Sequence, residues 1–353
     1  MVAMSEAAPV EVAVIGVGRM GRHHARTYAQ LPGARLVAVV DKDEERAATV
    51  ADEYGCDFYT DLEPMLAAHP DVAAVSVAVP TVRHAAIATP LLNRGIACLV
   101  EKPLAATVAE ARQLAEAARS SAAVLQVGHT ERFNPAVRAV AGLEIPARFM
   151  EVHRVSPMTF RSLDVGVVMD MMIHDLDIVL ALARSPVHKV DAIGVPILGE
   201  HEDIANARIV FESGCVANVT ASRLAFDTHR RLRLFSEAAY VSLDYQKRTG
   251  IVIRKSDNEF AFRELRDEIL AGADLSNLDY SGLVMIDELT MDLPDGEQDP
   301  LTAELTSFLG AVQTGGPPMV DGYAGSAAVE LAENVVRAIR DHKWEGLGSA
   351  RVW

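Results

Sequence analysis

The stretch that precedes Asp41 constrains the fold of this chain more than any other part of its sequence. An apolar, β-branched run at residues 10–15 leads into GVGRMG at residues 16–21, and a helix-like stretch and a second apolar run follow at residues 22–30 and 36–40. The first glycine of such a turn permits a tight bend, the second lets a pyrophosphate approach the backbone, and the third lets the helix pack closely against the strand. This unit predicts an α/β fold whose N-terminal domain is a doubly wound parallel sheet that binds a dinucleotide.

The start of that helix is a favourable place for phosphate, because its backbone N–H groups are free and its dipole end is positive. We therefore expect the cofactor to contact Gly16, Gly18, Arg19, Met20 and Gly21. Asp41 ends the second apolar run, where a carboxylate accepts hydrogen bonds from ribose hydroxyls and repels a 2′-phosphate. The expected cofactor is NAD, and NADP is the alternative because Arg19 or Lys42 could accommodate the extra phosphate. A chance glycine turn without a cofactor is the other alternative.

Alternating strand-like and helix-like segments continue to residue 129 and predict the rest of the parallel sheet. Sheets of this kind bind ligands beyond the carboxyl ends of their strands. Three points of the sequence lie at such ends, namely Pro80-Thr81, Glu101-Lys102-Pro103 and Gly128-His129. An ammonium group at Lys102 could polarise a carbonyl or stabilise an alkoxide beside a nicotinamide ring, although a surface Glu-Lys pair is the simpler interpretation of the tripeptide alone. The remaining expected cofactor contacts are Thr81, His84, Glu101 and Lys102.

From residue 130 onward, alternation typical of antiparallel strands replaces the earlier pattern. We expect a dinucleotide-binding domain over residues 9–129, and a substrate-binding and oligomerisation domain over residues 130–353 that is built on a large, mostly antiparallel sheet with helices. The acidic segment 256–298 has no clear assignment, and helices are expected at residues 301–313 and 323–341. A sheet with one bare face would expose a large apolar area, so we expect the domain to pack against a copy of itself in a homodimer or homotetramer.

One stretch of the second domain, VVMDMMIHDLDI at residues 167–178, carries candidate catalytic groups. Asp170, His174 and Asp177 are spaced i, i+4 and i+7, which in an α-helix places them on one face. A histidine titrates near neutrality, as a general base should, and a carboxylate one turn away can orient its ring. The alternatives are a metal site made by the same three residues and a helix with a solvated polar face. Apolar residues on both flanks favour a helix at a domain junction, and no metal is expected.

The charge balance limits the partners of the chain. Its 33 Lys and Arg residues against 49 Asp and Glu residues give a net charge of −16, which disfavours binding to nucleic acids or anionic membrane surfaces. An anionic substrate would need local cations, and ordinary surface arginines are the alternative reading of each candidate. The candidates are Arg132 with the neighbouring Asn134, Arg154 and Arg161.

Nothing in the sequence marks the chain for export or for a membrane. The N-terminus lacks a signal-peptide pattern, and no apolar run approaches the roughly 20 residues of a spanning helix. The three cysteines, Cys56, Cys98 and Cys215, are far apart and form no metal or disulfide motif. We therefore expect a cytoplasmic protein.

Taken together, four motifs resemble those of the Gfo/Idh/MocA oxidoreductase family. They are GVGRMG at residues 16–21, EKP at 101–103, D-x-x-x-H-x-x-D at 170–177 and PLTAELTSFLGAVQTGGPPMVDG at 300–322. The resemblance implies a Rossmann domain, an α/β domain whose open sheet makes dimers or tetramers, and hydride exchange between NAD(P) and a sugar or cyclitol hydroxyl. It gives Lys102 and His174 the catalytic roles, with Asp170 at the acidic position one turn earlier. Met172 stands where members of the family often have glycine.

Two further segments, GHTERFNPAV at residues 128–137 and DVGVVMDMMIHDLDIV at 164–179, look most like family members that oxidise the 3-hydroxyl of UDP-N-acetylglucosamine. By this resemblance the chain is expected to be an NAD-dependent dehydrogenase of that substrate or of a related UDP-amino sugar. The expected substrate contacts are Arg132, Asn134, Arg154, Arg161 and Asp177. The alternatives are a free-sugar or inositol dehydrogenase, an enzyme that retains its NAD and oxidises its substrate only transiently, and a non-catalytic NAD-binding regulator.

Overall fold

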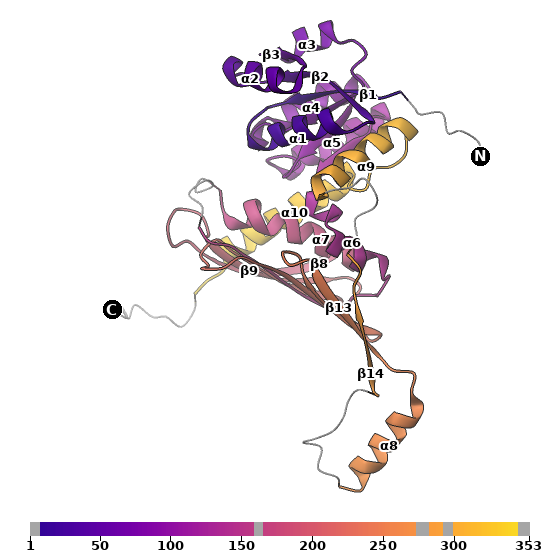
Figure 1. Ribbon diagram of the computed structural model, residues 1–353. Helices are drawn as coiled ribbons and strands as arrows, with labels where there is room; N and C mark the ends of the chain where they lie inside the picture. The colour runs from indigo at the N-terminus through magenta and orange to yellow at the C-terminus, as the bar shows by residue number, and fades with distance from the viewer. Residues whose placement is uncertain (1–7, 159–164, 273–281, 292–298, 345–353) are drawn as a thin grey trace, which may run out of the picture. The chain divides into compact units, whose positions relative to one another are not determined.

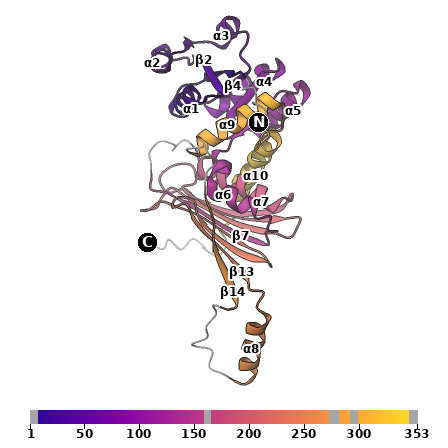
Figure 2. The same ribbon diagram turned by 45° about the vertical axis from the view of Figure 1, so that its right-hand side comes forward.

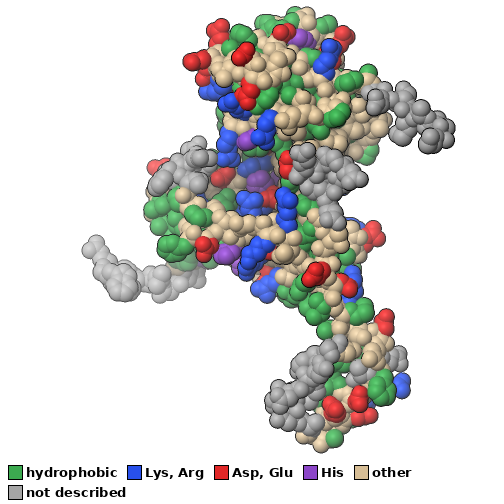
Figure 3. Space-filling view, viewed as in Figure 1, with side chains coloured by type: hydrophobic (Ala, Val, Ile, Leu, Met, Phe, Trp, Pro, Cys, Tyr) green, Lys and Arg blue, Asp and Glu red, His purple; other side chains and the backbone are tan. Residues whose placement is uncertain are grey.

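The computed structural model describes residues 8–158, 165–272, 282–291 and 299–344. The chain forms two compact units (Figure 1). The first unit comprises Met1–Asn134 and Leu293–Asn334, and the second comprises Pro135–Asp292 and Val335–Trp353. Within the described ranges, no helix is long and apolar enough to cross a membrane. Asp and Glu side chains are spread over the visible face of both units (Figure 3).

The first unit is built on a six-stranded parallel sheet with the order β3-β2-β1-β4-β5-β6. The strands are β1 Val10–Ile15, β2 Ala34–Val40, β3 Asp57–Tyr59, β4 Ala74–Val77, β5 Ala97–Glu101 and β6 Leu125–Gly128. The order reverses between β1 and β4, and this switch point is where open α/β sheets bind their ligands. The predicted doubly wound parallel sheet is therefore confirmed.

Helices cover this sheet on both faces and connect its strands. They are α1 Arg19–Gln30, α2 Glu44–Tyr54, α3 Leu62–Ala68, α4 His84–Asn93 and α5 Val108–Ser121, with short 3-10 helices η1 Thr81–Arg83 and η2 Thr130–Phe133.

A helix from late in the sequence also belongs to the first unit. In α9, Pro300–Thr314, the side chains of Leu305, Phe308 and Leu309 join the apolar core beneath β1 and α1. Figure 1 shows α9 beside α1. The expected division placed every residue from 130 onward in the second domain, whereas the structure groups residues 293–334 with the first. An apolar helix face predicts burial but does not say against which sheet.

The second unit is built on an eight-stranded sheet with the order β14-β13-β12-β11-β7-β10-β9-β8. The strands are β7 Phe149–Val155, β8 Val187–Val195, β9 Ile204–Phe211, β10 Val216–Ser222, β11 His229–Phe235, β12 Ala239–Asp244, β13 Thr249–Lys255 and β14 Val284–Glu288. Every neighbouring pair is antiparallel except β7 and β10, which are parallel. The predicted large, mostly antiparallel sheet is confirmed.

Helices of the second unit lie on one side of this sheet, as the two views in Figure 1 and Figure 2 agree. They are α6 Pro135–Gly142, α7 Ile173–Ala183 and the last part of α10 Gly322–Asp341. The segment that had no sequence assignment contains α8, Glu259–Leu270, and the edge strand β14.

The other face of the sheet carries polar side chains in the middle of its central strands and apolar side chains nearer their ends. Alternation along the strands directs the buried residues toward the helices and the remaining residues outward. The outward polar side chains include Glu151, His153, Asn206, Arg208, Asn218, Thr220, Arg231, Arg233, Ser242 and Asp244. A row of half-buried apolar side chains crosses five strands on the same face, namely Val210, Val216, Phe149, Phe235 and Tyr240. The packing of this face against a second copy therefore stays a prediction.

Candidate active site

The glycine turn between β1 and α1 has the geometry that a bound pyrophosphate requires. Gly16 has φ +83°, and a Cβ there would lie 2.7 Å from the carbonyl oxygen of Ala78. A Cβ on Gly21 would lie 1.8 Å from the carbonyl oxygen of Gly16, so α1 can pack here only without a side chain. Nothing lies within 4 Å of a Cβ built on Gly18, which begins α1 without a side-chain cap. The three glycines therefore fit the three roles expected for a dinucleotide turn.

Asp41, at the end of β2, is tied directly to this turn. Its Oδ2 accepts a hydrogen bond from the Val17 N–H at 2.9 Å, and its Oδ1 accepts one from the Asp43 N–H at 3.0 Å. Arg46 Nη1 lies 3.3 Å from Oδ2, and Arg46 Nη2 donates to Asp43 Oδ2 at 2.7 Å. An ionised carboxylate has about four acceptor positions, so Asp41 can still accept from a ribose. The sequence predicted Asp41 as a ribose contact but did not identify Arg46 as its neighbour. The position of Arg46 at the start of the next helix was the available signal.

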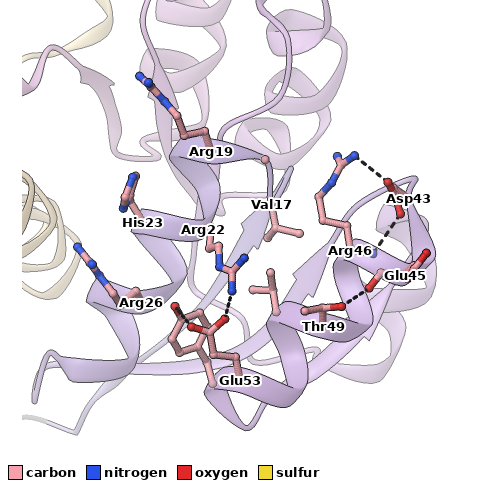
Figure 4. A pocket seen from close by; sticks show the side chains of 13 residues that line it. Val17, Arg19, Arg22, His23, Arg26, Asp43, Glu45, Arg46, Thr49 and Glu53 are labelled. Atoms are coloured by element: carbon pink, nitrogen blue, oxygen red, sulfur yellow. Dashed lines mark hydrogen bonds and ion pairs between the residues drawn. The ribbon is translucent and has the colours of Figure 1, made fainter.

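A cavity of about 760 Å³ opens between α1 and α2 next to the turn (Figure 4). Val17, Gly18 and Arg19 line one end of it. Along α1 it is lined by basic side chains, including the expected cofactor contact Arg19, which is exposed. Burial and the neighbouring charges of Arg26 and Arg19 lower the pKa of His23, so this imidazole is neutral at neutral pH. Arg22 forms an ion pair across the cavity with Glu53 (Figure 4).

The carboxyl end of β5 carries Glu101, a carboxylate held between two elements. Its Oε1 accepts a hydrogen bond from His24 Nε2 of α1 at 2.9 Å, and its Oε2 accepts one from the Lys102 N–H at 3.2 Å. Burial by itself would raise the pKa of Glu101, but the hydrogen bond and charge of His24 and the charge of Lys102 lower it below its ordinary value. Glu101 is therefore ionised next to Lys102, which is half-buried.

Thr81 and His84 follow β4, the strand next to β5 in the sheet. The His84 ring is buried, with Nδ1 2.9 Å from the carbonyl oxygen of Pro103 and Nε2 2.9 Å from that of Val79. It thus links the loop after β4 to the loop after β5, and its direct contact with a cofactor stays a prediction. Thr81 begins η1 and is half-buried, as is Met20 in the first turn of α1.

In the second unit, the segment predicted as one α-helix begins as a π-helix. The π-helix η3, Val168–Met172, includes Asp170, and α-helical geometry begins only at Ile173, one residue before His174. Asp170 therefore lies in the π-helical part and His174 in the α-helical part of this segment, and the placement of the two side chains on one face stays a prediction. Segments of this kind are rare and are frequent at functional sites.

Glu202 supports the start of η3. Its Oε1 accepts the Val168 N–H at 3.2 Å, and its carbonyl oxygen accepts the Val167 N–H at 2.9 Å. A Cβ on Gly166 would lie 2.1 Å from Glu202 Oε1, so the glycine makes room for this contact. Asp170 and His174 are half-buried and Asp177 is 2% exposed.

Two other residues that the sequence singled out, Met172 and Arg154, lie in or next to this helix. Met172, at the position where family members often have glycine, is fully buried in the interior of the second unit. Arg154 of β7 is also buried, and its Nε and Nη2 donate to the two oxygens of Asp175 at 2.8 and 2.9 Å. The Arg154 guanidinium is thus paired inside the protein with Asp175, the residue directly after His174.

The remaining candidates divide between the loop after β6 and residues outside the described ranges. Arg132 lies in η2 and is half-buried. Asn134 is 8% exposed and donates to Glu131 Oε2 at 3.1 Å, while His129 is fully buried. Arg161 lies outside the described residues. Among those that are described, no group of three or more His, Cys, Asp or Glu side chains is arranged to hold a metal ion.

Sequence reasoning missed three buried groups behind the sheet edge: His24, Ser76 and Glu304. Glu304 of α9 is fully buried, and its Oε2 accepts from Thr130 Oγ1 at 2.9 Å. Burial and the nearby charge of Glu101 raise its pKa well above the ordinary value. One signal was available, since Glu304 is the single charged residue between Pro300 and Thr314.

Comparisons with known proteins match both units. Residues 10–129 match the Gfo/Idh/MocA oxidoreductase family with an NAD-binding Rossmann fold, and residues 145–242 match the Gfo/Idh/MocA C-terminal domain. The UDP-N-acetylglucosamine 3-dehydrogenase of Acidithiobacillus ferrooxidans is 35% identical over 328 residues, which are 92% of this chain and 96% of that protein. The inositol 2-dehydrogenase of Rhizobium meliloti is 26% identical over 95% of this chain and 98% of that protein.

Solved structures agree with these sequence matches. The Acidithiobacillus ferrooxidans enzyme superposes with a TM-score of 0.82 at 32% identity, covering 94% of this chain and 98% of that chain. A levoglucosan dehydrogenase in complex with NADH superposes with a TM-score of 0.78 at 19% identity, covering 94% of this chain and 97% of that chain, which shows the shared fold alone.

Proposed function

Because this chain belongs to the Gfo/Idh/MocA family of oxidoreductases, we propose that it transfers hydride between NAD and the 3-hydroxyl of UDP-N-acetylglucosamine or a related UDP-amino sugar. The observation that carries this proposal is the 35% identity to the Acidithiobacillus ferrooxidans 3-dehydrogenase along nearly the whole of both chains. A second candidate, a free-polyol dehydrogenase, is favoured by the weaker match to inositol 2-dehydrogenase, which also spans both chains.

Asp41 supports NAD over NADP. A 2′-phosphate beside this carboxylate would meet a like charge, and Arg46, the cation that could offset it, is already paired with Asp41 and Asp43. Comparing kcat/KM for the two cofactors tests this choice. We expect the native protein to prefer NAD and Asp41→Ala to narrow the gap, and a native preference for NADP would contradict the assignment.

The proposed chemistry assigns one role to each of three residues. Neutral His174 accepts the hydroxyl proton, Asp170 supports the imidazole, and Lys102 stabilises the negative charge that develops on the oxygen. The nicotinamide, when bound, accepts the hydride from the same carbon. A positioned base contributes roughly 10²–10⁴-fold, and one preorganised donor to a developing oxyanion contributes about 3–4 kcal/mol. Lys102→Ala and His174→Ala should therefore lose turnover and still bind NADH.

Local cations support a nucleotide-linked substrate. In a chain of net charge −16, a diphosphate needs a positive contact, and Arg132 and Arg161 are proposed for it, with Asn134 and Asp177 as polar contacts. Arg154, already paired with Asp175, is proposed to support the His174 helix instead.

A substrate panel tests the function directly. The reduced-nicotinamide absorbance is followed with UDP-N-acetylglucosamine, free N-acetylglucosamine, inositol and other UDP-sugars. The proposal predicts the highest kcat/KM with a UDP-amino sugar. Equal or greater efficiency with inositol or the free sugar would replace it with the second candidate.

A further inference from the structure

A buried run of hydrogen-bonding groups leads from α1 to the edge of the sheet that carries Lys102. The Tyr28 hydroxyl lies 2.9 Å from Ser76 Oγ, which lies 3.0 Å from His24 Nδ1. The other ring nitrogen of His24 donates to Glu101 Oε1 at 2.9 Å. Tyr28, Ser76 and His24 are 0% exposed, whereas Glu101 is 8% exposed, so the carboxylate is the member that reaches the surface.

Glu101 has little freedom at this position. One oxygen is bonded to His24 and the other to the Lys102 N–H. On the neighbouring strand, a Cβ on Gly128 would lie 3.0 Å from Glu101 Cα and 3.1 Å from Oε2, so β6 closes the remaining side. The orientation of the Glu101 carboxylate is therefore set by His24, and that of the Lys102 backbone is set in part by Glu101.

Several titratable groups surround the Glu101 carboxylate. His24 faces it from α1, with Tyr28 behind His24 through Ser76, and Lys102 follows it in the chain. The carboxyl of Glu304 lies near it on α9, and burial together with the negative charge of Glu101 raises the pKa of Glu304 well above its ordinary value. Because the pKa of Glu101 is lowered, Glu101 is the more readily ionised of these two carboxyls.

We propose that His24 is a positioning residue for Lys102, acting through Glu101: the Ser76–His24 pair fixes the carboxylate that in turn fixes the backbone and the electrostatic environment of the lysine. This inference rests on the proposed role of Lys102 in the reaction. His24 contacts neither substrate nor cofactor in this scheme. A misplacement of about 1 Å in a reacting group can reduce turnover about a hundredfold, so an indirect effect on Lys102 is measurable.

Three variants separate positioning from a purely structural role. His24→Leu keeps the side-chain volume and removes both hydrogen bonds, whereas His24→Gln keeps a donor near the position of Nε2. Ser76→Ala removes only the contact to Nδ1. His188→Gln, at an exposed histidine in the second unit, is the matched control. The measurements are kcat and KM with the best UDP-sugar, the Kd of NADH by fluorescence, the thermal midpoint, and kcat against pH.

We expect His24→Leu to lower kcat about ten- to a hundredfold while the Kd of NADH changes less than about threefold. His24→Gln should recover most of this loss, Ser76→Ala should show a smaller effect of the same kind, and His188→Gln should match the native protein. The loss of His24 removes the contacts that hold down the pKa of Glu101, so the acidic limb of the pH profile should move to higher pH in His24→Leu.

Several results would overturn the inference. They are an unchanged kcat and acidic limb in His24→Leu, a loss of NADH binding in the same proportion as kcat, or a Gln variant no better than Leu. If His24→Leu fails to fold, the decision passes to His24→Gln and Ser76→Ala: a folded Ser76→Ala with native kcat and native acidic limb refutes positioning. Lys102→Ala, measured in parallel, isolates the proposed function, because native turnover in that variant refutes the role of the lysine whatever the His24 variants do.

Discussion

Removing one partner of the buried Arg154–Asp175 pair should strongly destabilise the second unit. The two side chains are 5% and 1% exposed and are joined by hydrogen bonds of 2.8 and 2.9 Å. Arg154→Met fills the space with an apolar side chain and leaves the Asp175 charge without its bidentate partner. Breaking such a pair costs about 3–5 kcal/mol, a large share of the roughly 5–15 kcal/mol that stabilises a typical domain.

The second unit can be observed selectively by tryptophan fluorescence, because Trp344 belongs to it and the sequence of the first unit contains no tryptophan. Urea unfolding followed by tryptophan fluorescence should show a fall in midpoint of at least about 1 M for Arg154→Met, given m-values of about 1–3 kcal/mol/M. The double variant Arg154→Met with Asp175→Leu removes both charges and should recover most of the loss, since apolar replacements of buried pairs are often neutral or stabilising.

An exposed ion pair provides the control for this experiment. Arg119 and Glu116 form an i, i+3 pair on α5 with side chains 65% and 53% exposed, and such pairs contribute only about 0–1 kcal/mol. Arg119→Met should accordingly leave stability nearly unchanged. The reasoning fails if Arg154→Met unfolds within about 1 kcal/mol of the native protein, or if the double variant is no more stable than the single one. A raised KM with native stability would instead give Arg154 the substrate contact that the sequence predicted.

Three further outcomes are expected. Glu304→Gln should gain stability over the native protein as pH rises above about 4.3, because the native fold, with its raised Glu304 pKa, retains a proton that the unfolded chain releases, and this release favours unfolding of the native protein; urea unfolding at pH 5 and pH 8 checks this, and an equal difference at both would contradict it. Gly21→Ala should weaken NADH binding at least about tenfold, because its Cβ would collide with the Gly16 carbonyl oxygen, whereas Gly142→Ala, with nothing within 4 Å, should bind NADH as the native protein does. Arg132→Ala should raise KM for a UDP-sugar about ten- to a hundredfold with a smaller change in kcat, and a native KM would remove it from the substrate site.

Local signals made the first unit predictable. The turn at residues 16–21 requires glycine at Gly16 and Gly21, and an acidic residue follows at the end of the next strand, so the order of elements and the place of Asp41 could be inferred together. The central strands of the second unit were likewise predictable, because one face of each is buried and the sequence alternates accordingly, whereas the exposed edge strand β14 was not.

Contacts between distant residues were not predictable from these patterns. Arg154 and Asp175 are 21 positions apart, and nothing in either segment says that the arginine turns inward to meet the helix. The sequence of Val168–Met172 does not distinguish a π-helix from an α-helix. The distinguishing feature is a tertiary contact, because Glu202, more than 30 residues away, accepts hydrogen bonds from the N–H groups at the start of this segment. Polar residues on the open sheet face were visible in the sequence, but which face the helices cover became clear only with the register of the strands.

Four of the buried carboxyls that the structure describes fall into three different environments, and the difference separates supporting groups from those at the edge of the parallel sheet. Asp175 and Asp203 are paired with the buried guanidinium groups of Arg154 and Arg223, which stay charged at all physiological pH values. Glu101 is paired with a histidine, and burial raises the pKa of Glu304 well above its ordinary value, which favours its protonated form. A carboxyl paired with histidine and a carboxyl with a raised pKa change their charge at pH values at which an arginine–carboxylate pair keeps both of its charges. These two responsive carboxyls lie together near Lys102, at the carboxyl end of the parallel sheet. Because perturbed titratable groups cluster at functional sites, this arrangement favours the edge of β5 as the first unit's contribution to the active site.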